Sequence, residues 1–201
     1  QGFGASHVVS GYDFVFGKGR GGHCDLLLKM GAQQGFGFTA VNAIEDDSGE
    51  VYSSTRVRDR LLAADPRGAA AVLGRDFEIE GRVITGESRG HAIGFPTANI
   101  SLGSYQHPAG GVYAIRASVE DGAGVQWMDG VANIGVRPTF GGETLVLEVY
   151  LFDFDGNLYG RRLRVRLIDF LREEKKFDGI DALKAQTALD VTKAKEILKK
   201  L

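Results

Sequence analysis

Residues 144–154 read TLVLEVYLFDF, and this stretch decides which fold the second half of the chain can adopt. Side chains alternate between the two faces of a strand, so one face carries Leu145, Leu147, Val149 and Leu151. The opposite face is apolar too, apart from a single carboxylate, Glu148. A strand that is apolar on both faces is expected to be largely buried.

A carboxylate in such a strand needs a cation, strong hydrogen-bond donors or a proton of its own. Two interpretations of Glu148 follow, and the pattern favours neither. In the first interpretation, Glu148 is a general base that takes a proton from a substrate. Alternatively, it is the structural partner of an arginine such as Arg137.

Other short strands separated by turns surround this one. Leu163, Val165 and Leu167 alternate with three arginines, which is typical of a strand with one buried face and one wet face. Glycine and aspartate clusters separate the segments, as in an antiparallel barrel or sandwich. The further predicted strands span 77–85, 112–119, 125–134 and 159–168, and a C-terminal helix carries apolar residues from 180 to 201 every three or four positions.

The first third of the chain has a different pattern. A strand at 7–9, a helix over 25–34 and a strand over 38–44 predict an α/β unit with a parallel sheet. Two strands are too few for an independent sheet of this kind, so we expect an N-terminal segment to be missing. Helices follow near Ser53 and over 69–73, and the predicted domains are 1–76 and 77–201.

Composition excludes several classes of protein. The 201 residues carry a net charge of −2, which disfavours a nucleic-acid-binding protein. The lone cysteine, Cys24, allows no internal disulfide and is typical of a cytoplasmic protein. No apolar run is long enough to span a membrane, and the sequence predicts no oligomeric state.

A second candidate site lies at Gly94-Phe95-Pro96-Thr97-Ala98-Asn99. Pro96 favours an extended backbone before it, and in an extended chain Thr97 and Asn99 point to the same side. A hydroxyl and an amide oxygen suit Mg²⁺ or a phosphate, although the spacing alone favours an ordinary turn before a strand. The glycine-punctuated loop over 85–91 offers further backbone N–H groups to a phosphate.

The hydroxyls at Ser53–Thr55, with Arg58 one turn further on, form either a phosphate site at a helix start or a plain helix cap.

Taken together, these segments resemble the bacterial bifunctional riboflavin kinase/FMN adenylyltransferase (FAD synthetase) family over nearly the whole chain. The kinase-like part begins at Phe77, and the earlier part is similar to the back half of the adenylyltransferase domain. The matching kinase segments are 81–83, 94–99, 111–113, 133–140, 147–149, 158–160 and 172–177, and the earlier ones are 11–17, 53–58 and 73–75.

The resemblance implies an incomplete Rossmann-like α/β part followed by a six-stranded antiparallel β-barrel with a C-terminal helix. It implies ATP, Mg²⁺ and a flavin as the bound molecules. Thr97 and Asn99 would hold Mg²⁺ and ATP, Glu148 would be the base, and Arg172 and Phe177 would face the flavin. The remaining implied residues are Gly81, Arg82, Gly90, His91 and Gly94 at the phosphates, and Asp13, Ser54, Thr55 and Arg58 in the adenylyltransferase site.

Three departures from the family pattern accompany the resemblance. The His-x-Gly-His motif of the adenylyltransferase is absent, so this chain alone is not expected to make FAD. His91 stands where a lysine or arginine is usual, and Tyr150 replaces a common histidine. The predicted activity is therefore riboflavin phosphorylation, with FAD synthesis or noncatalytic flavin binding as the alternatives. No nucleic acid or membrane partner is expected.

Overall fold

The computed structural model describes residues 4–84, 95–120, 125–139 and 142–201, and the predicted phosphate residues Gly90, His91 and Gly94 lie outside these ranges. Two compact units divide the chain between Tyr52 and Ser53. Each unit is described by itself. The predicted division into 1–76 and 77–201 stays a prediction.

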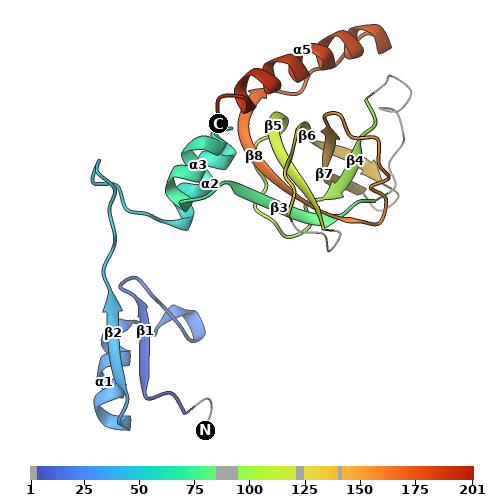
Figure 1. Ribbon diagram of the computed structural model, residues 1–201. Coiled ribbons are helices and arrows are strands. Elements are labelled where there is room, and N and C mark those ends of the chain that lie inside the picture. The colour runs from blue at the N-terminus through green and yellow to red at the C-terminus, as the bar shows by residue number, and fades with distance from the viewer. Residues whose placement is uncertain (1–3, 85–94, 121–124, 140–141) are drawn as a thin grey trace. The chain divides into compact units, whose positions relative to one another are not determined.

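The first unit is a strand–helix–strand unit, as the sequence predicts. Strand β1 (His7–Gly11) pairs in parallel with β2 (Gly37–Val41). A short 3₁₀ helix, η1 (Lys18–Arg20), and helix α1 (Cys24–Gln34) connect them (Figure 1). Helix α1 ends where Gly35 adopts φ 78°, a left-handed conformation that glycine adopts without steric cost. Strand β2 ends three residues earlier than predicted.

The second unit opens with two short helices, α2 (Ser54–Leu62) and α3 (Pro66–Leu73). Ser53 caps α2 by accepting a hydrogen bond from the Arg56 backbone, and Asp65 caps α3 in the same way from Gly68. The helices bury a small apolar cluster of Val57, Leu61 and Ala69, against which Val72, Leu73 and Phe77 also pack.

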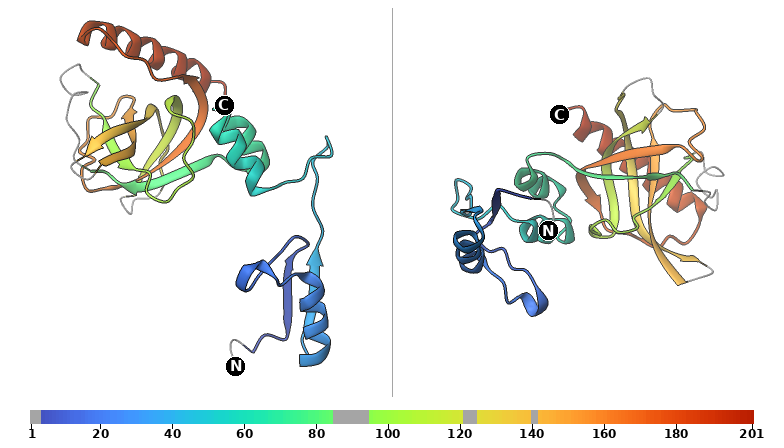
Figure 2. Two further views of the ribbon diagram at one scale, coloured as in Figure 1. Left: turned by 180° about the vertical axis from the view of Figure 1, so that it is seen from behind. Right: turned by 90° about the horizontal axis from the view of Figure 1, so that it is seen from below.

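Six antiparallel strands form the body of the second unit in the order β3-β8-β5-β6-β7-β4. A bridge between Ile84 and Asn99 joins the two outermost segments, so the sheet curls toward closure (Figure 2). The predicted antiparallel β-structure is confirmed, although the sequence missed the four-residue strand β4. The strands are β3 (Phe77–Arg82), β4 (Ala98–Ser101), β5 (Gly111–Glu120), β6 (Met128–Thr139), β7 (Gly142–Leu151) and β8 (Arg162–Arg172).

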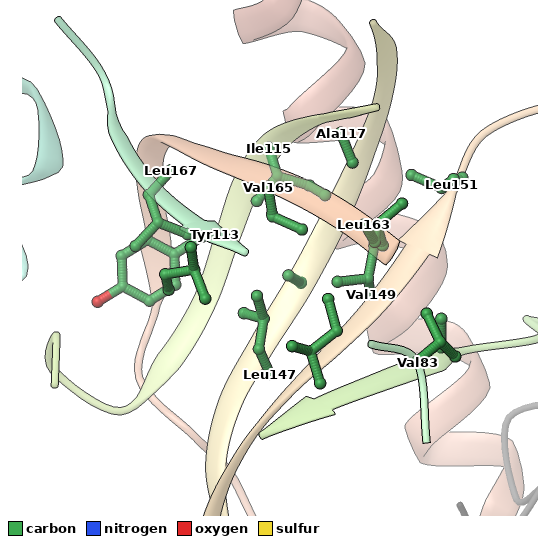
Figure 3. Packing of buried hydrophobic residues seen from close by; sticks show 14 of the residues in the cluster. Val83, Tyr113, Ile115, Ala117, Leu147, Val149, Leu151, Leu163, Val165 and Leu167 are labelled. Atoms are coloured by element: carbon green, nitrogen blue, oxygen red, sulfur yellow. The ribbon is translucent and has the colours of Figure 1, made fainter. Parts of the chain in front are cut away.

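The interior of the curled sheet is the main core. Leu163, Val165 and Leu167 of β8 are fully buried there, which confirms the predicted alternation with the arginines. Figure 3 shows these side chains in one cluster with Ile115 of the neighbouring strand β5 and Leu147 of β7. Burial of such side chains contributes about 1.5–3 kcal/mol each, so this core supplies much of the unit's stability.

The outer face of the sheet carries a second apolar cluster, which helix α5 (Ile180–Leu198) covers (Figure 1). Ala194 and Leu198 of the helix pack against Val112, Val131 and Ile168 of the strands. The helix begins after Gly179.

Strand β8 changes register twice where it pairs with β5. Irregularities fall between Val112 and Tyr113 and between Ala114 and Ile115 of β5. As a result, Phe170 packs against the inner core while Ile168 and Leu171 join the outer cluster.

Gly81 marks the closest approach of β3 to β4. A Cβ atom at this position would overlap the Cγ2 of Ile100, which is fully buried and has no space to move into. We expect Gly81→Ala to lower the free energy of unfolding by about 1–3 kcal/mol through overpacking. Urea denaturation followed by fluorescence of the single tryptophan, Trp127, measures this change in the second unit.

Gly110→Ala is the matched control, because the nearest atom to its added Cβ is the Ile134 carbonyl oxygen at 3.5 Å, an ordinary contact. Equal stability of the two variants would contradict the close approach of β3 and β4.

Glu78 lies between two arginines on the wet face of the sheet. Its carboxylate accepts hydrogen bonds from the Nε of Arg164 at 2.7 Å and of Arg166 at 3.1 Å. Burial by itself would raise the pKa of the Glu78 carboxyl, but the two arginines outweigh burial and hold the pKa below its usual value of 4.5. Trp127 stacks on the Arg166 guanidinium, with 3.7 Å from Cζ to the ring centroid.

Because the folded-state pKa of Glu78 is lowered, its stabilisation is present above pH 4.5 and is lost as pH falls through the lowered value. We expect the wild type to unfold at higher urea than Glu78→Gln at about pH 6, and this difference to shrink toward about pH 3. Urea denaturation of both proteins across that range measures it. A pH-independent difference would contradict the role of the arginines.

Candidate functional site

A row of residues crosses the outer face of the sheet from β4 to β8. The strand register pairs Asn99 with Glu148, Glu148 with Asn133, Asn133 with Val112, and Val112 with Arg172. Directly opposed residues project to the same face with their Cβ atoms about 4.5–5.5 Å apart. We call these five residues the cross-strand row. It brings three of the sequence-predicted residues, Asn99, Glu148 and Arg172, onto one surface.

Glu148 is half-buried and lies between Asn99 and Asn133 in this row. The Nε of Arg137 donates to its Oε1 at 3.0 Å, and a terminal nitrogen of Arg137 donates to its Oε2 at 2.7 Å. The predicted partnership with Arg137 is therefore confirmed. Arg–carboxylate pairs of this two-pronged kind are among the strongest side-chain hydrogen bonds. The carboxylate is thus fixed in direction, and its side chain keeps 26% of its surface exposed.

Asn99 lies directly beside Glu148 and is 8% exposed. Its neighbours Ala98 and Ile100 point into the main core, which directs the Asn99 amide to the outer face. Among the described residues, no other side chain forms a hydrogen bond with this amide. Thr97 is half-buried and precedes β4 by one residue.

An aromatic contact holds the segment before β4 against β7. The Phe95 ring meets the Tyr150 ring edge-on, with the centroids 5.2 Å apart. The Phe-Pro-Thr-Ala-Asn segment therefore lies along β7 from Phe95 onward, in the same antiparallel direction as β4. Thr97 is therefore anchored on both sides, by Phe95 and by Asn99.

The far end of the row is fixed by helix α5. Arg172 donates to both oxygens of Asp190 at 2.7–3.0 Å, and Gln186 donates to the same carboxylate at 2.9 Å. The Arg172 Cζ lies 5.8 Å from the centre of the Phe177 ring. The structure thus brings together the two residues that the resemblance assigns to the flavin.

Between the two ends, Glu174 comes to the sheet from the segment after β8. Its Oε1 accepts a hydrogen bond from the Asn133 amide at 2.9 Å. The same oxygen occupies the space that a side chain at Gly135 would fill, so a larger residue there would displace the Glu174 carboxylate. The segment that begins at Glu173 therefore contacts the outer face next to Glu148.

Sequence reasoning missed Asp190, Gln186, Asn133 and Glu174. For Asp190 a signal exists, because it lies three residues after Thr187 and four before Ala194, on the apolar stripe of the predicted helix. A carboxylate on such a stripe needs a buried cation. For Asn133 no such signal exists, because its importance comes from the strand register alone.

The other predicted residues have local roles in the structure. Gly81 lies against Ile100, and Arg82 donates to the Gly160 carbonyl at 3.0 Å. Their contact with ATP stays a prediction.

The residues assigned to adenylyl transfer fall into both units. Arg58 donates to the Thr55 hydroxyl at 3.2 Å within α2, where Ser54 is the first residue. Asp13 belongs to the first unit. Their role in adenylyl transfer also stays a prediction.

Within the described residues, no helix is both long and apolar enough to cross a membrane.

Comparison with known proteins covers both parts of the chain. The chain is 44% identical over 198 residues to a bifunctional riboflavin kinase/FMN adenylyltransferase of Pseudomonas fluorescens, covering 98% of this chain and 62% of that protein. The protein of the same name in Bacillus subtilis is 36% identical, with 96% of this chain and 60% of that protein covered. The chain thus spans about 60% of the length of these curated relatives.

A solved structure shares the fold over most of the chain. It is described as a macrolide-efflux protein from Streptococcus pneumoniae, is 33% identical, and superposes with a TM-score of 0.75 over 92% of this chain and 59% of that one.

Two family matches divide the chain in the order that the sequence predicts. Residues 1–56 match the FAD synthetase family. Residues 73–198, which include the whole cross-strand row, match the riboflavin kinase family, and the chain belongs to that family.

Proposed function

We propose that the second unit transfers the γ-phosphoryl group of ATP to the 5′-hydroxyl of riboflavin, giving FMN and ADP. The observation that carries this proposal is the pairing of Asn99 with Glu148 across β4 and β7. It sets a carboxylate beside an amide and a hydroxyl at one end of the cross-strand row, while Arg172 and Phe177 form the other end. Membership of the riboflavin kinase family supports the same activity.

Glu148 is the base in this proposal. The hydroxyl oxygen of riboflavin attacks the γ-phosphorus, the bond from that phosphorus to the β,γ-bridging oxygen breaks, and ADP leaves with the electron pair. The hydroxyl proton passes to the Glu148 carboxylate. The transition state of such transfers is loose, so Glu148 contributes mainly by orienting the hydroxyl and accepting its proton late.

The donor set of Thr97 and Asn99 fits Mg²⁺. Both residues offer uncharged oxygen atoms, and Mg²⁺ at nucleotide sites is held by a few protein oxygens together with phosphates and water. Among the described residues, no group of three or more histidine, cysteine or acidic side chains provides a separate metal site. When bound, Mg²⁺ would offset the charge of the phosphates. Thr97 and Asn99 position the triphosphate beside Glu148.

The flavin would lie toward Arg172. Phe177 offers a ring for stacking, and Asn133 and Glu174 offer polar atoms between Glu148 and Arg172. The buried Asp190 keeps the Arg172 guanidinium in one orientation, so this end of the site is organised before the ligand arrives.

Adenylylation of FMN to FAD is a second candidate activity. The match of residues 1–56 to the FAD synthetase family favours it. Asp13, Ser54, Thr55 and Arg58 are its candidate residues. A cytoplasmic location, suggested by the single cysteine, is part of the same proposal.

Incubation of the chain with riboflavin, ATP and Mg²⁺, followed by chromatography of the flavins, tests the proposal. We expect FMN to form with ADP in equal amounts. FMN together with FAD would support the second activity as well. Bound but unchanged riboflavin would contradict kinase activity and indicate a flavin-binding barrel.

Replacement of Glu148 tests the role of the base. We expect Glu148→Gln to lower kcat by at least tenfold, and by up to about 10⁴-fold, because glutamine keeps the shape but accepts no proton. The dissociation constant of riboflavin, measured by fluorescence quenching, should stay nearly unchanged. Glu120→Gln is the control, since Glu120 is an exposed strand carboxylate outside the row. Equal kcat of Glu148→Gln and the wild type would remove Glu148 from this role.

A further inference from the structure

The proposed base is already occupied by an arginine. Both carboxylate oxygens of Glu148 accept N–H groups of Arg137, at 3.0 and 2.7 Å. A carboxylate held in this way keeps a further lone pair on each oxygen, but the cation beside it opposes transfer of a proton from a substrate hydroxyl. Loss of at least part of this contact would therefore favour the proton transfer.

The arginine reaches Glu148 from a distant position on the neighbouring strand. Arg137 pairs with Thr144, whereas Glu148 pairs with Asn133, four residues away along β6. Four residues of a strand span about 13 Å, so both side chains extend toward each other above the strands. The position between them on β6 is Gly135, which has no side chain. The Arg137 side chain is thus long and extended, and 41% of its surface is exposed.

The second arginine on this face is held very differently. Arg172 is bound through several hydrogen bonds to the buried Asp190, and only 16% of its side chain is exposed. Moving Arg172 would leave a buried carboxylate without its cation, which costs several kcal/mol. Moving Arg137 leaves a carboxylate that is partly in water. Of these two arginines, Arg137 is therefore the one that can be redirected when a ligand binds.

The arriving nucleotide offers Arg137 a better partner. ATP brings its terminal phosphate to Thr97 and Asn99 in the proposed function, and Asn99 lies directly beside Glu148. The guanidinium fork matches two phosphate oxygens as well as it matches two carboxylate oxygens, and the phosphate carries more charge.

We propose that Arg137 moves from the Glu148 carboxylate to the terminal phosphate of bound ATP, which frees the base and adds a cation to the group being transferred. This inference rests on the proposed function, because it takes Glu148 as the base. In the transfer step, Arg137 stays protonated and hydrogen-bonded to the γ-phosphoryl oxygens. The hydroxyl proton goes to Glu148, and the electron pair of the broken bond leaves with ADP.

The test compares a nucleotide that has a terminal phosphate with one that lacks it. The affinities of AMP-PNP and of ADP, each with Mg²⁺, are measured by isothermal titration calorimetry for the wild type and Arg137→Gln. We expect Arg137→Gln to lower the affinity for AMP-PNP at least tenfold and the affinity for ADP less than twofold. Arg137→Lys keeps the charge but not the forked guanidinium, so its affinity for AMP-PNP should lie between those of the wild type and Arg137→Gln. Unchanged AMP-PNP binding, or an equal loss for both nucleotides, would overturn the proposal.

A second measurement uses the competition between the two partners of Arg137. Glu148→Gln removes the competing carboxylate, so it should raise the affinity for AMP-PNP severalfold. In the Arg137→Gln background the same change should have no effect. An equal effect in both backgrounds would contradict the transfer of Arg137 from carboxylate to phosphate.

Arg67→Gln is the matched control, because Arg67 forms an exposed ion pair with Asp169 at 2.8 Å outside the row. It should bind both nucleotides like the wild type. Thermal melting of each variant verifies that it is folded, and Arg137→Lys takes the place of Arg137→Gln if the latter unfolds. FMN formation by the wild type together with unchanged AMP-PNP binding by the variant would refute this inference alone. Failure of the wild type to bind either nucleotide would refute the proposed function as well.

Discussion

The antiparallel register of β4, β7 and β6 is the constraint on which the site depends. It places Asn99, Glu148 and Asn133 opposite one another, with their chain neighbours in the main core. A slip of one residue would turn every side chain of a strand to the other face. The buried apolar residues on the inner face make such a slip very costly. The core therefore determines which polar side chains meet on the outside, although it contains none of them.

The sequence predicts the elements better than the contacts between them. Alternation of apolar residues reveals the buried strand around Glu148 because the pattern is local and regular. Strand β4 is missed, since four residues after a proline carry too little periodicity. The pairing of Asn99 with Glu148 is equally hidden from pattern analysis, because 49 positions of chain separate them and only the folded register brings them together.

Two arginines of the outer face form similar ion pairs that differ in burial. Arg172 and Arg137 each bind a carboxylate through two or more hydrogen bonds. The first pair is buried beneath α5 and fixes one end of the row, whereas the second is partly exposed to water. The resemblance indicated Arg172 directly. The difference in exposure between the two arginines is visible only in the structure.

The two register changes in β8 let one strand serve both apolar clusters. Up to Leu167 its buried residues face inward, but Ile168 and Leu171 face outward beneath the helix. The number of residues between Leu167 and Arg172 is therefore as important as their identity. Substitutions in this segment can be absorbed by repacking, whereas an insertion or deletion of one residue would rotate Arg172 away from Asp190. Length variation among natural variants should accordingly be absent here and accumulate in the connecting loops.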